Sequence, residues 1–185
     1  MRIDQLKKNY NIKVRWTAFP LHPETPDDGL TLEELFAGQP IDIKKVMARL
    51  KQVADDLGLP LGERKKTYNS RMAQELAKWA ESEGKGDSFH EAVFRAYFVD
   101  GENIGRVDEL VTLAKSFGLP SKKARSVLEL RTFKEAVDSD WLRSHVFGIT
   151  GVPTFVVDDQ ATVGFQPYEV LEQFLKTCGI KRLNQ

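Results

Sequence analysis

Cysteine is almost absent from this chain of 185 residues, which contains only Cys178. A single cysteine can form no internal disulfide and no multi-cysteine metal site. Cys178 follows Phe174 by four positions and Leu171 by seven, so helical spacing places it on the core face of the last predicted helix. We interpret it as a small buried apolar residue rather than a displaced nucleophile, and expect it to alkylate slowly.

Long apolar runs and an excess of one charge are also lacking. No stretch approaches the roughly 18 apolar residues of a membrane-spanning helix, and the first residues are too polar for a signal peptide. We therefore expect a cytoplasmic protein. The 27 basic and 27 acidic side chains balance, so composition favours neither nucleic acid nor an acidic membrane as a partner.

The three histidines, His22, His90 and His145, lie on one loop and two different predicted helices. No Asp, Glu or Cys recurs near them at the spacing of a metal site or a catalytic triad. We therefore predict no metal site in this chain.

The sequence near the two ends of the chain predicts short helices and strands. After a short helix, apolar and polar residues alternate over residues 12–18 with the period of a strand, and Trp16 lies on the covered face. Near the C-terminus, residues 161–165 form a second short strand, and a last helix begins at Pro167. That helix should turn four residues to the core: Val170, Leu171, Phe174 and Leu175.

Between these ends, residues 31–146 carry a helical apolar pattern almost throughout. The clearest helix begins after Asp42, a candidate N-cap, and ends at Gly58. Another helix should begin at Ser88, with Glu91 completing a capping box. The clearest helix carries one apolar stripe, made of Ile43, Val46, Met47, Leu50, Val53, Ala54 and Leu57.

Gly148 and Gly151 precede Val152-Pro153 and the apolar run of residues 154–157. The glycines permit a sharp turn, and the run is typical of a buried strand. Proline fits the first residue of a strand because it has no N–H for a ladder. The Val152-Pro153 bond is either an ordinary trans bond or a cis bond that exposes the backbone of Val152 to an extended peptide.

The sequence Gly-Val-Pro-Thr-Phe at residues 151–155 resembles the cis-proline loop of the thioredoxin superfamily. Further segments extend the resemblance over most of the chain and are together similar to the DsbA-like branch typified by FrnE. These segments are Trp16 to Pro23, where Pro23 opens the run Pro-Glu-Thr-Pro, with Gly29 after it; Asn69 to Ala77; Phe94 to Phe98; and Gly164 to Tyr168.

The resemblance implies an α/β, thioredoxin-like fold with a large all-helical insertion. Residues 1–30 and 148–185 would form an incomplete thioredoxin-like domain, and residues 31–147 the inserted helical subdomain. In this family a first strand leads into a Cys-x-x-Cys motif, and we expect that segment to precede Arg2. The slot that this strand would fill should be occupied by an upstream segment, by direct closure of its neighbours, or by a second copy in a homodimer.

The resemblance also implies site residues. Val152 and Pro153 would bind the substrate, and no catalytic residue is expected within the chain. Trp16 would line the cleft, unless it simply packs in the core. Asn69 lies where relatives carry polar residues facing the cleft, although it or its neighbour can also cap the next helix. Gln166 would border the cleft at the start of the last helix.

By resemblance, the chain is a thiol-disulfide oxidoreductase or isomerase that acts on protein or peptide substrates without a cofactor. Because it lacks a dithiol, we expect no activity in dithiol exchange. One alternative is a glutathione-dependent enzyme resembling 2-hydroxychromene-2-carboxylate isomerase, which would bring glutathione as a cofactor. Another alternative is a non-catalytic protein that binds peptides.

Overall fold

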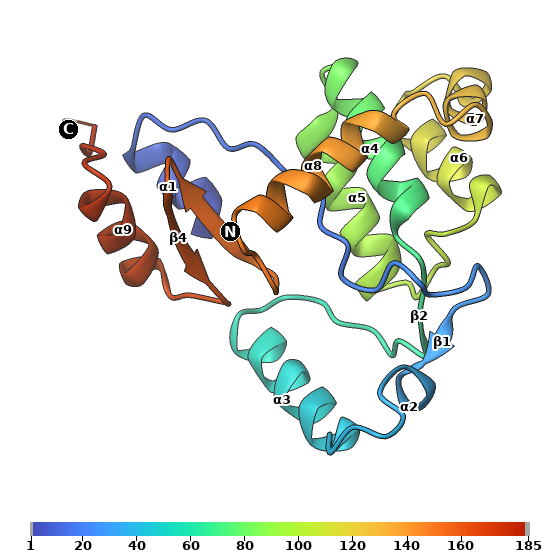
Figure 1. Cartoon of the computed structure of the whole chain (residues 1–185), viewed down its shortest axis with the longest axis horizontal. Helices are drawn as coiled ribbons and strands as arrows, with labels where there is room; N and C mark the ends of the chain where they lie inside the picture. The colour runs from blue at the N-terminus through green and yellow to red at the C-terminus, as the bar shows by residue number, and fades with distance from the viewer. Residues whose placement is uncertain (1, 184–185) are drawn as a thin grey trace. The chain divides into compact units, whose positions relative to one another are not determined.

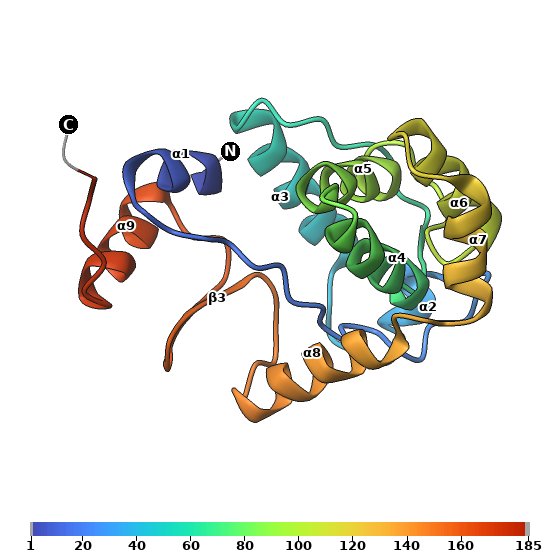
Figure 2. The ribbon, with the colours of Figure 1, turned by 90° about the horizontal axis from the view of Figure 1, so that it is seen from above.

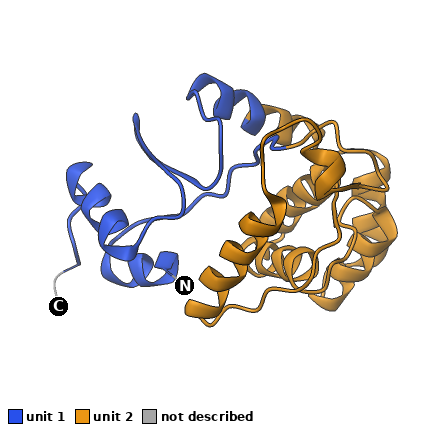
Figure 3. Cartoon of the chain, turned by 90° about the horizontal axis from the view of Figure 1, so that it is seen from below, with its two compact units in different colours: residues 1–21, 140–185 blue, residues 22–139 orange. Residues whose placement is uncertain are grey.

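The computed structural model describes residues 2–183, which divide into two compact units (Figure 3). We call residues 1–21 and 140–185 the terminal unit, and residues 22–139 the helical unit. The predicted bounds of the helical insertion, residues 31–147, stay a prediction. Within residues 2–183, no helix combines the length and the apolar character that a bilayer crossing demands.

The terminal unit contains two helices that pack together. Helix α1 (Arg2–Asn9) lies alongside helix α9 (Tyr168–Thr177), as Figures 1 and 2 both show. Val170 was predicted to face the core but is 43% exposed, because it is turned by about 100° from the buried face of α9. The buried residues of this contact are Leu6, Tyr10, Leu171 and Leu175.

A hairpin and residues 140–146, the end of helix α8 (Lys134–Val146), complete the terminal unit. Strands β3 (Thr154–Val157) and β4 (Gln160–Val163) pair antiparallel, with Thr154 opposite Val163. The strand predicted at residues 154–157 is confirmed. The second strand ends two residues earlier than predicted, because Gly164 has a φ of +93° and turns the chain out of the extended conformation.

The strand predicted at residues 12–18 is wrong as a member of a sheet. Exposure alternates along these residues as predicted, but among residues 2–183 they pair with no strand. Their polar partner is the buried carboxylate of Asp140, which accepts hydrogen bonds from the backbone N–H of Ala18 at 2.9 Å and from Arg15 at 2.8 Å. Alternation predicts which side chains are covered, whereas a ladder also needs a neighbouring strand.

The helical unit is built on four helices, α4 to α7 (Figure 1). A two-residue ladder joins Leu30 to Thr67, and it was not predicted because so short a strand shows no periodicity. The elements are β1 (Leu30–Thr31), α2 (Leu32–Leu35), α3 (Ile43–Asp56), β2 (Lys66–Thr67), α4 (Arg71–Ser82), α5 (Gly86–Phe98), α6 (Val107–Ser116), α7 (Ser121–Glu129) and the start of α8 (Lys134–Val146). The largest buried core residues are Trp79, Phe89, Leu76, Leu110 and Leu128.

Two predicted helix starts have opposite outcomes. The Asp42 cap is confirmed, because its carboxylate accepts the backbone N–H of Lys45 at 3.0 Å. The capping box at Ser88 is wrong: α5 begins earlier, with Lys85 as its N-cap, and the Ser88 hydroxyl donates to the carbonyl of Lys85. Gly84, with a φ of +72°, already reverses the chain just before this point.

Glu75 is a carboxylate with no exposed surface inside the helical unit. Arg131 donates two hydrogen bonds to it, at 2.8 and 2.6 Å, and Arg71 donates a third at 2.6 Å. Burial raises the pKa of the Glu75 carboxyl, but the hydrogen bonds and charges of Arg131 and Arg71 outweigh burial and hold the pKa below its usual value. The group is therefore an ionised, fully paired buried charge.

Arg131 occupies the C′ position just after α7, where glycine is the usual residue. Its φ is +53°, and the N–H groups of Arg131 and Thr132 close α7 by bonding to the carbonyls of Leu128 and Val127, which is the Schellman pattern. A left-handed conformation costs a non-glycine residue roughly 1 kcal/mol or more. The bidentate hydrogen bonding of Arg131 to Glu75 offsets that cost.

Replacement of Glu75 by glutamine should lower the free energy of unfolding by about 3 kcal/mol at pH 7, because two guanidinium groups lose their buried partner. A lowered pKa means that the carboxylate stabilises the fold above the ordinary value near 4.5 and loses this effect as the pH falls through the folded pKa. The deficit of Glu75→Gln should therefore shrink in acid. Urea denaturation followed by circular dichroism measures both effects, and the exposed Glu91→Gln serves as the control. Equal losses in the two variants would contradict this role.

Candidate functional site

The loop before β3 presents the candidate site. The peptide bond between Val152 and Pro153 is cis, the conformation that the resemblance implies. The Thr154 hydroxyl donates to the carbonyl of Gly151 at 2.7 Å, and the Gly164 N–H donates to the carbonyl of Pro153 at 2.8 Å. These two bonds fasten the loop on both sides of Val152.

Val152 itself is left open. Its residue surface is 50% exposed, and among residues 2–183 no hydrogen bond engages its backbone N–H or C=O. Backbone polar groups of a folded chain are nearly always paired, with protein or with water. A free N–H and C=O next to the start of a strand can pair with an extended peptide, as in the addition of one strand to a sheet.

Gln166 lies near this loop, because Gly164 contacts Pro153 and is only two residues away in the chain. The Gln166 side chain is already used locally, since its amide donates to the carbonyl of Val163 at 2.7 Å. Its role as a binding residue stays a prediction.

Arg2 contacts the segment that follows β4, and the sequence did not predict this contact. Its guanidinium lies 4.0 Å from the centre of the Phe165 ring and donates to the carbonyl of Gln166 at 2.9 Å. The ring of Phe165 is 56% exposed. No local signal could reveal this contact, because its partners are more than 160 positions apart in the chain.

Trp16 is half-buried on the extended run of residues 12–18. The hydrogen bonds of Arg15 and Ala18 to Asp140 hold this run on both sides of the tryptophan. Either assignment of Trp16, to a cleft or to the core, stays a prediction.

Asn69 belongs to the helical unit, where its side chain forms three hydrogen bonds. Its amide N–H groups donate to the carbonyls of Pro23 and Thr25 at 2.9 and 3.0 Å. Its carboxamide oxygen accepts the N–H of Arg71 at 2.9 Å, so Asn69 closes the start of α4, while Ser70 makes no side-chain cap bond. These bonds give Asn69 a structural role, and its part in a binding site stays a prediction.

A small cleft of about 150 Å³ opens beside Asn69 in the helical unit. It is lined by Asp27, Asn69, Arg71, Met72, Gly105 and Arg131. Arg71 is paired with Glu75 and Asp138, and Arg131 with Glu75, so neither arginine offers an unpaired positive charge to the cleft. Residues 2–183 bring together no group of three or more His, Cys, Asp or Glu side chains that could hold a metal ion.

Cys178 differs from its predicted place. It is the C-cap of α9 and half-buried, not a residue of the buried helix face, because α9 ends at Thr177. Its thiol lies 3.7 Å from the carboxamide oxygen of Gln160. Burial raises the pKa of the Cys178 thiol, and the negative charges of Asp158 and Asp159 raise it further. A raised pKa leaves little thiolate, which is the reactive form.

Comparison with known proteins supplies a family and a fold. The model of the DSBA-like thioredoxin domain matches residues 1–176. The uncharacterized protein YwbO of Bacillus subtilis (strain 168) is 28% identical over 171 residues, which cover 90% of this chain and 82% of YwbO. The crystal structure of the probable DsbA oxidoreductase SCO1869 from Streptomyces coelicolor matches with a TM-score of 0.79 and 26% identity, over 88% of this chain and 74% of that one.

A further solved structure, that of a 2-hydroxychromene-2-carboxylate isomerase, matches with a TM-score of 0.73 over 96% of this chain and 85% of the isomerase. Its sequence is 19% identical, so this likeness concerns the fold alone. Together the matches confirm the predicted thioredoxin-like fold with a large helical part.

Alkylation tests the assignment of Cys178. Its reaction with iodoacetamide at pH 7 should be several-fold slower than that of a free thiol, because of its raised pKa. Asp158→Asn should lower the pKa and speed the reaction by about twofold, since one nearby negative charge is removed. Asparagine tolerates the left-handed φ of position 158, so the turn should persist. Glu169→Gln, at the other end of α9, is the control and should change nothing; fast alkylation of the unaltered chain would contradict the assignment.

Proposed function

This chain belongs to the family of DsbA-like thioredoxin domains, and from that membership we propose that it takes part in thiol-disulfide chemistry of the FrnE kind, by holding an extended polypeptide at Val152. The observation that carries the proposal is that this residue is half exposed and that its backbone N–H and C=O form no hydrogen bond among residues 2–183. Protein or peptide thiols and disulfides are the proposed substrates.

The physical reason lies in the geometry of disulfide exchange. A thiolate attacks one sulfur of a disulfide, so the disulfide must be held in a fixed direction relative to the attacking group. Pairing of the substrate backbone with Val152 would fix that direction independently of the substrate's side chains. Thr154 and Gly164 support this role, because their hydrogen bonds hold the residues on both sides of Val152.

The 185 residues contain one cysteine, so they supply no dithiol that could cycle between reduced and oxidised forms. We propose that they provide the substrate-binding half of the reaction and no nucleophile. The raised pKa of Cys178 supports this division, because a nucleophilic cysteine needs a lowered pKa.

Two alternative functions follow from other features. A glutathione-dependent isomerase has the likeness in fold to 2-hydroxychromene-2-carboxylate isomerase in its favour, and glutathione would then be the cofactor. A non-catalytic peptide-binding protein would need nothing beyond the Val152 loop. We further propose a cytoplasmic location. We also propose a homodimer in which the second copy fills the strand slot beside β3, because among residues 2–183 β3 pairs with β4 alone and its other edge has no neighbouring strand.

Peptide binding tests the role of Val152. The probe is an extended apolar peptide of about eight residues with S-methylcysteine at its centre, titrated into protein labelled with ¹⁵N. The Val152 amide signal should shift, and N-methylation of the peptide residue that pairs with Val152 should weaken binding about tenfold, because a backbone hydrogen bond is lost. N-methylation of the next residue, whose N–H points away, is the matched control. Equal affinity of all analogues would refute the proposed pairing.

Insulin reduction tests the absence of a dithiol activity. With dithiothreitol as the reductant, this chain should reduce insulin no faster than its Cys178→Ser variant, because neither holds a cysteine pair. A rate above that of the variant would show that Cys178 reacts, and would overturn the assignment of this chain to substrate binding alone.

A further inference from the structure

Helix α3 (Ile43–Asp56) and its C-cap residue, Leu57, expose a line of apolar side chains. Val46, Leu50 and Leu57 are 47%, 49% and 41% exposed, and Val53 between them is half-buried. Their successive spacings of four, three and four residues form the narrow seam by which one helix packs along another. Three further apolar residues of α3 are covered more fully: Ala54 is buried, and Ile43 and Met47 are half-buried. The exposed seam is therefore one edge of the single apolar stripe of α3, and it lies next to the edge that holds Met47 and Ala54.

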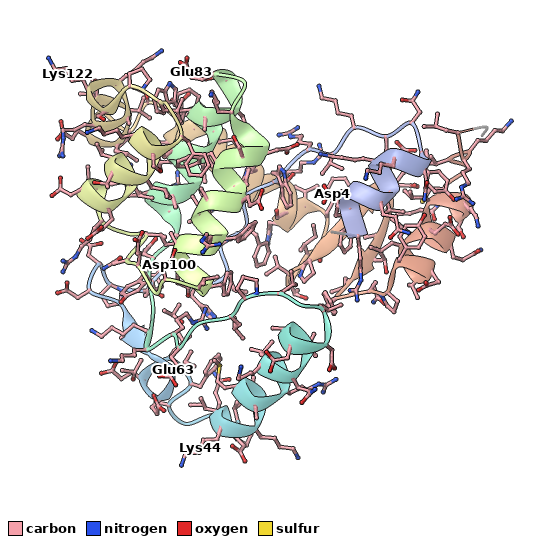
Figure 4. All side chains as sticks on the ribbon, turned by 180° about the vertical axis from the view of Figure 1, so that it is seen from behind. Asp4, Lys44, Glu63, Glu83, Asp100 and Lys122 are labelled. Carbon is pink, nitrogen blue, oxygen red and sulfur yellow. The ribbon has the colours of Figure 1, made fainter. Side chains whose placement is uncertain are left out.

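Opposite charges border this seam along one side. Arg49 precedes Leu50 and Asp56 precedes Leu57, so the two charged residues are seven positions apart and share one flank of the helix. The first turns of α3 are basic, with Lys44, shown in Figure 4, and Lys45, whereas its last turn is acidic. The side chains of Arg49 and Asp56 are both exposed.

This arrangement is complementary to itself when a second α3 runs in the opposite direction. A two-fold axis that sets Leu50 against Val53 of the second copy also sets Val46 against Leu57 of that copy. The same axis brings Arg49 beside Asp56 of the second copy, twice by symmetry. A parallel arrangement would turn Arg49 and Asp56 toward the uncharged flank of Met47 and Ala54 in the second copy, so the charges would find no partner, and it would align the two helix dipoles unfavourably.

We propose that the Val46–Leu57 seam of α3 is the contact through which two copies of this chain associate, antiparallel and about a two-fold axis. The inference rests on exposure, spacing and charge, and it is independent of the function proposed for Val152. The contact also differs from the strand slot beside β3, because it uses only side chains of α3.

The size of the seam sets the expected strength. Fourteen residues give α3 a length of about 21 Å, and one helix face offers less than the roughly 800 Å² per partner of a standard stable interface. We therefore expect a weak dimer, with a dissociation constant of about 10–100 µM, which salt should weaken further by screening the Arg49 and Asp56 pairs.

Charge exchange tests the proposal. Analytical ultracentrifugation at about 200 µM should find wild type mainly as a dimer. Arg49→Glu and Asp56→Arg should each raise the dissociation constant at least tenfold, because each places like charges side by side. An equimolar mixture of the two variants should recover dimers, as should the double variant, because opposite charges then face each other again.

Two further variants complete the test. Lys45→Glu reverses a charge of α3 away from the seam and should leave the dimer unchanged. Leu50→Glu should abolish the dimer, while circular dichroism should show that the helix content of all variants is retained. A monomeric wild type at this concentration, a dimer that persists in Leu50→Glu, or a mixture of the charge variants that stays monomeric would each overturn the proposal.

Discussion

Burial of the Glu75 carboxylate constrains where three segments of the helical unit can lie. A buried charge must be paired, and the two guanidinium groups that pair with Glu75 come from the start of α4 and from the residue after α7. Arg71 also donates to the carbonyl of Lys134 and to Asp138 in the first turns of α8. Glu75 and its two arginine partners thus connect α4, the end of α7 and the start of α8, and one of these partners, Arg131, has a left-handed backbone.

The terminal unit uses a buried carboxylate in a related way. Asp140 accepts the N–H of Ala18 and the guanidinium of Arg15, so a side chain of α8 provides what a neighbouring strand would provide in a sheet. Side chains can satisfy backbone groups where a ladder is lacking. The run of residues 12–18 therefore keeps the alternating exposure of a strand without belonging to one.

The candidate site differs from both carboxylate sites. Among residues 2–183 the backbone N–H and C=O of Val152 are unpaired, while the residues around Val152 are hydrogen-bonded. Gly151, Pro153 and Thr154 all take part in hydrogen bonds within the loop and hairpin. Val152 takes part in none among residues 2–183. A rigid support around one open residue is the arrangement that binding sites on loops generally need, since it reduces the entropy lost when a ligand is ordered.

Local signals in the sequence determined much of this protein: the strand at residues 154–157, the Asp42 cap, the helix after Pro167, and the proline loop by which the family is identified. These features depend on neighbours a few positions apart, which periodicity and turn chemistry report. Tertiary structure alone decided that Glu75 would meet Arg131, that Asp140 would replace a ladder for Ala18, and that α3 would expose its seam. Pairing and burial depend on groups distant in the chain, and a pattern within one segment holds no information about which distant group will cover it.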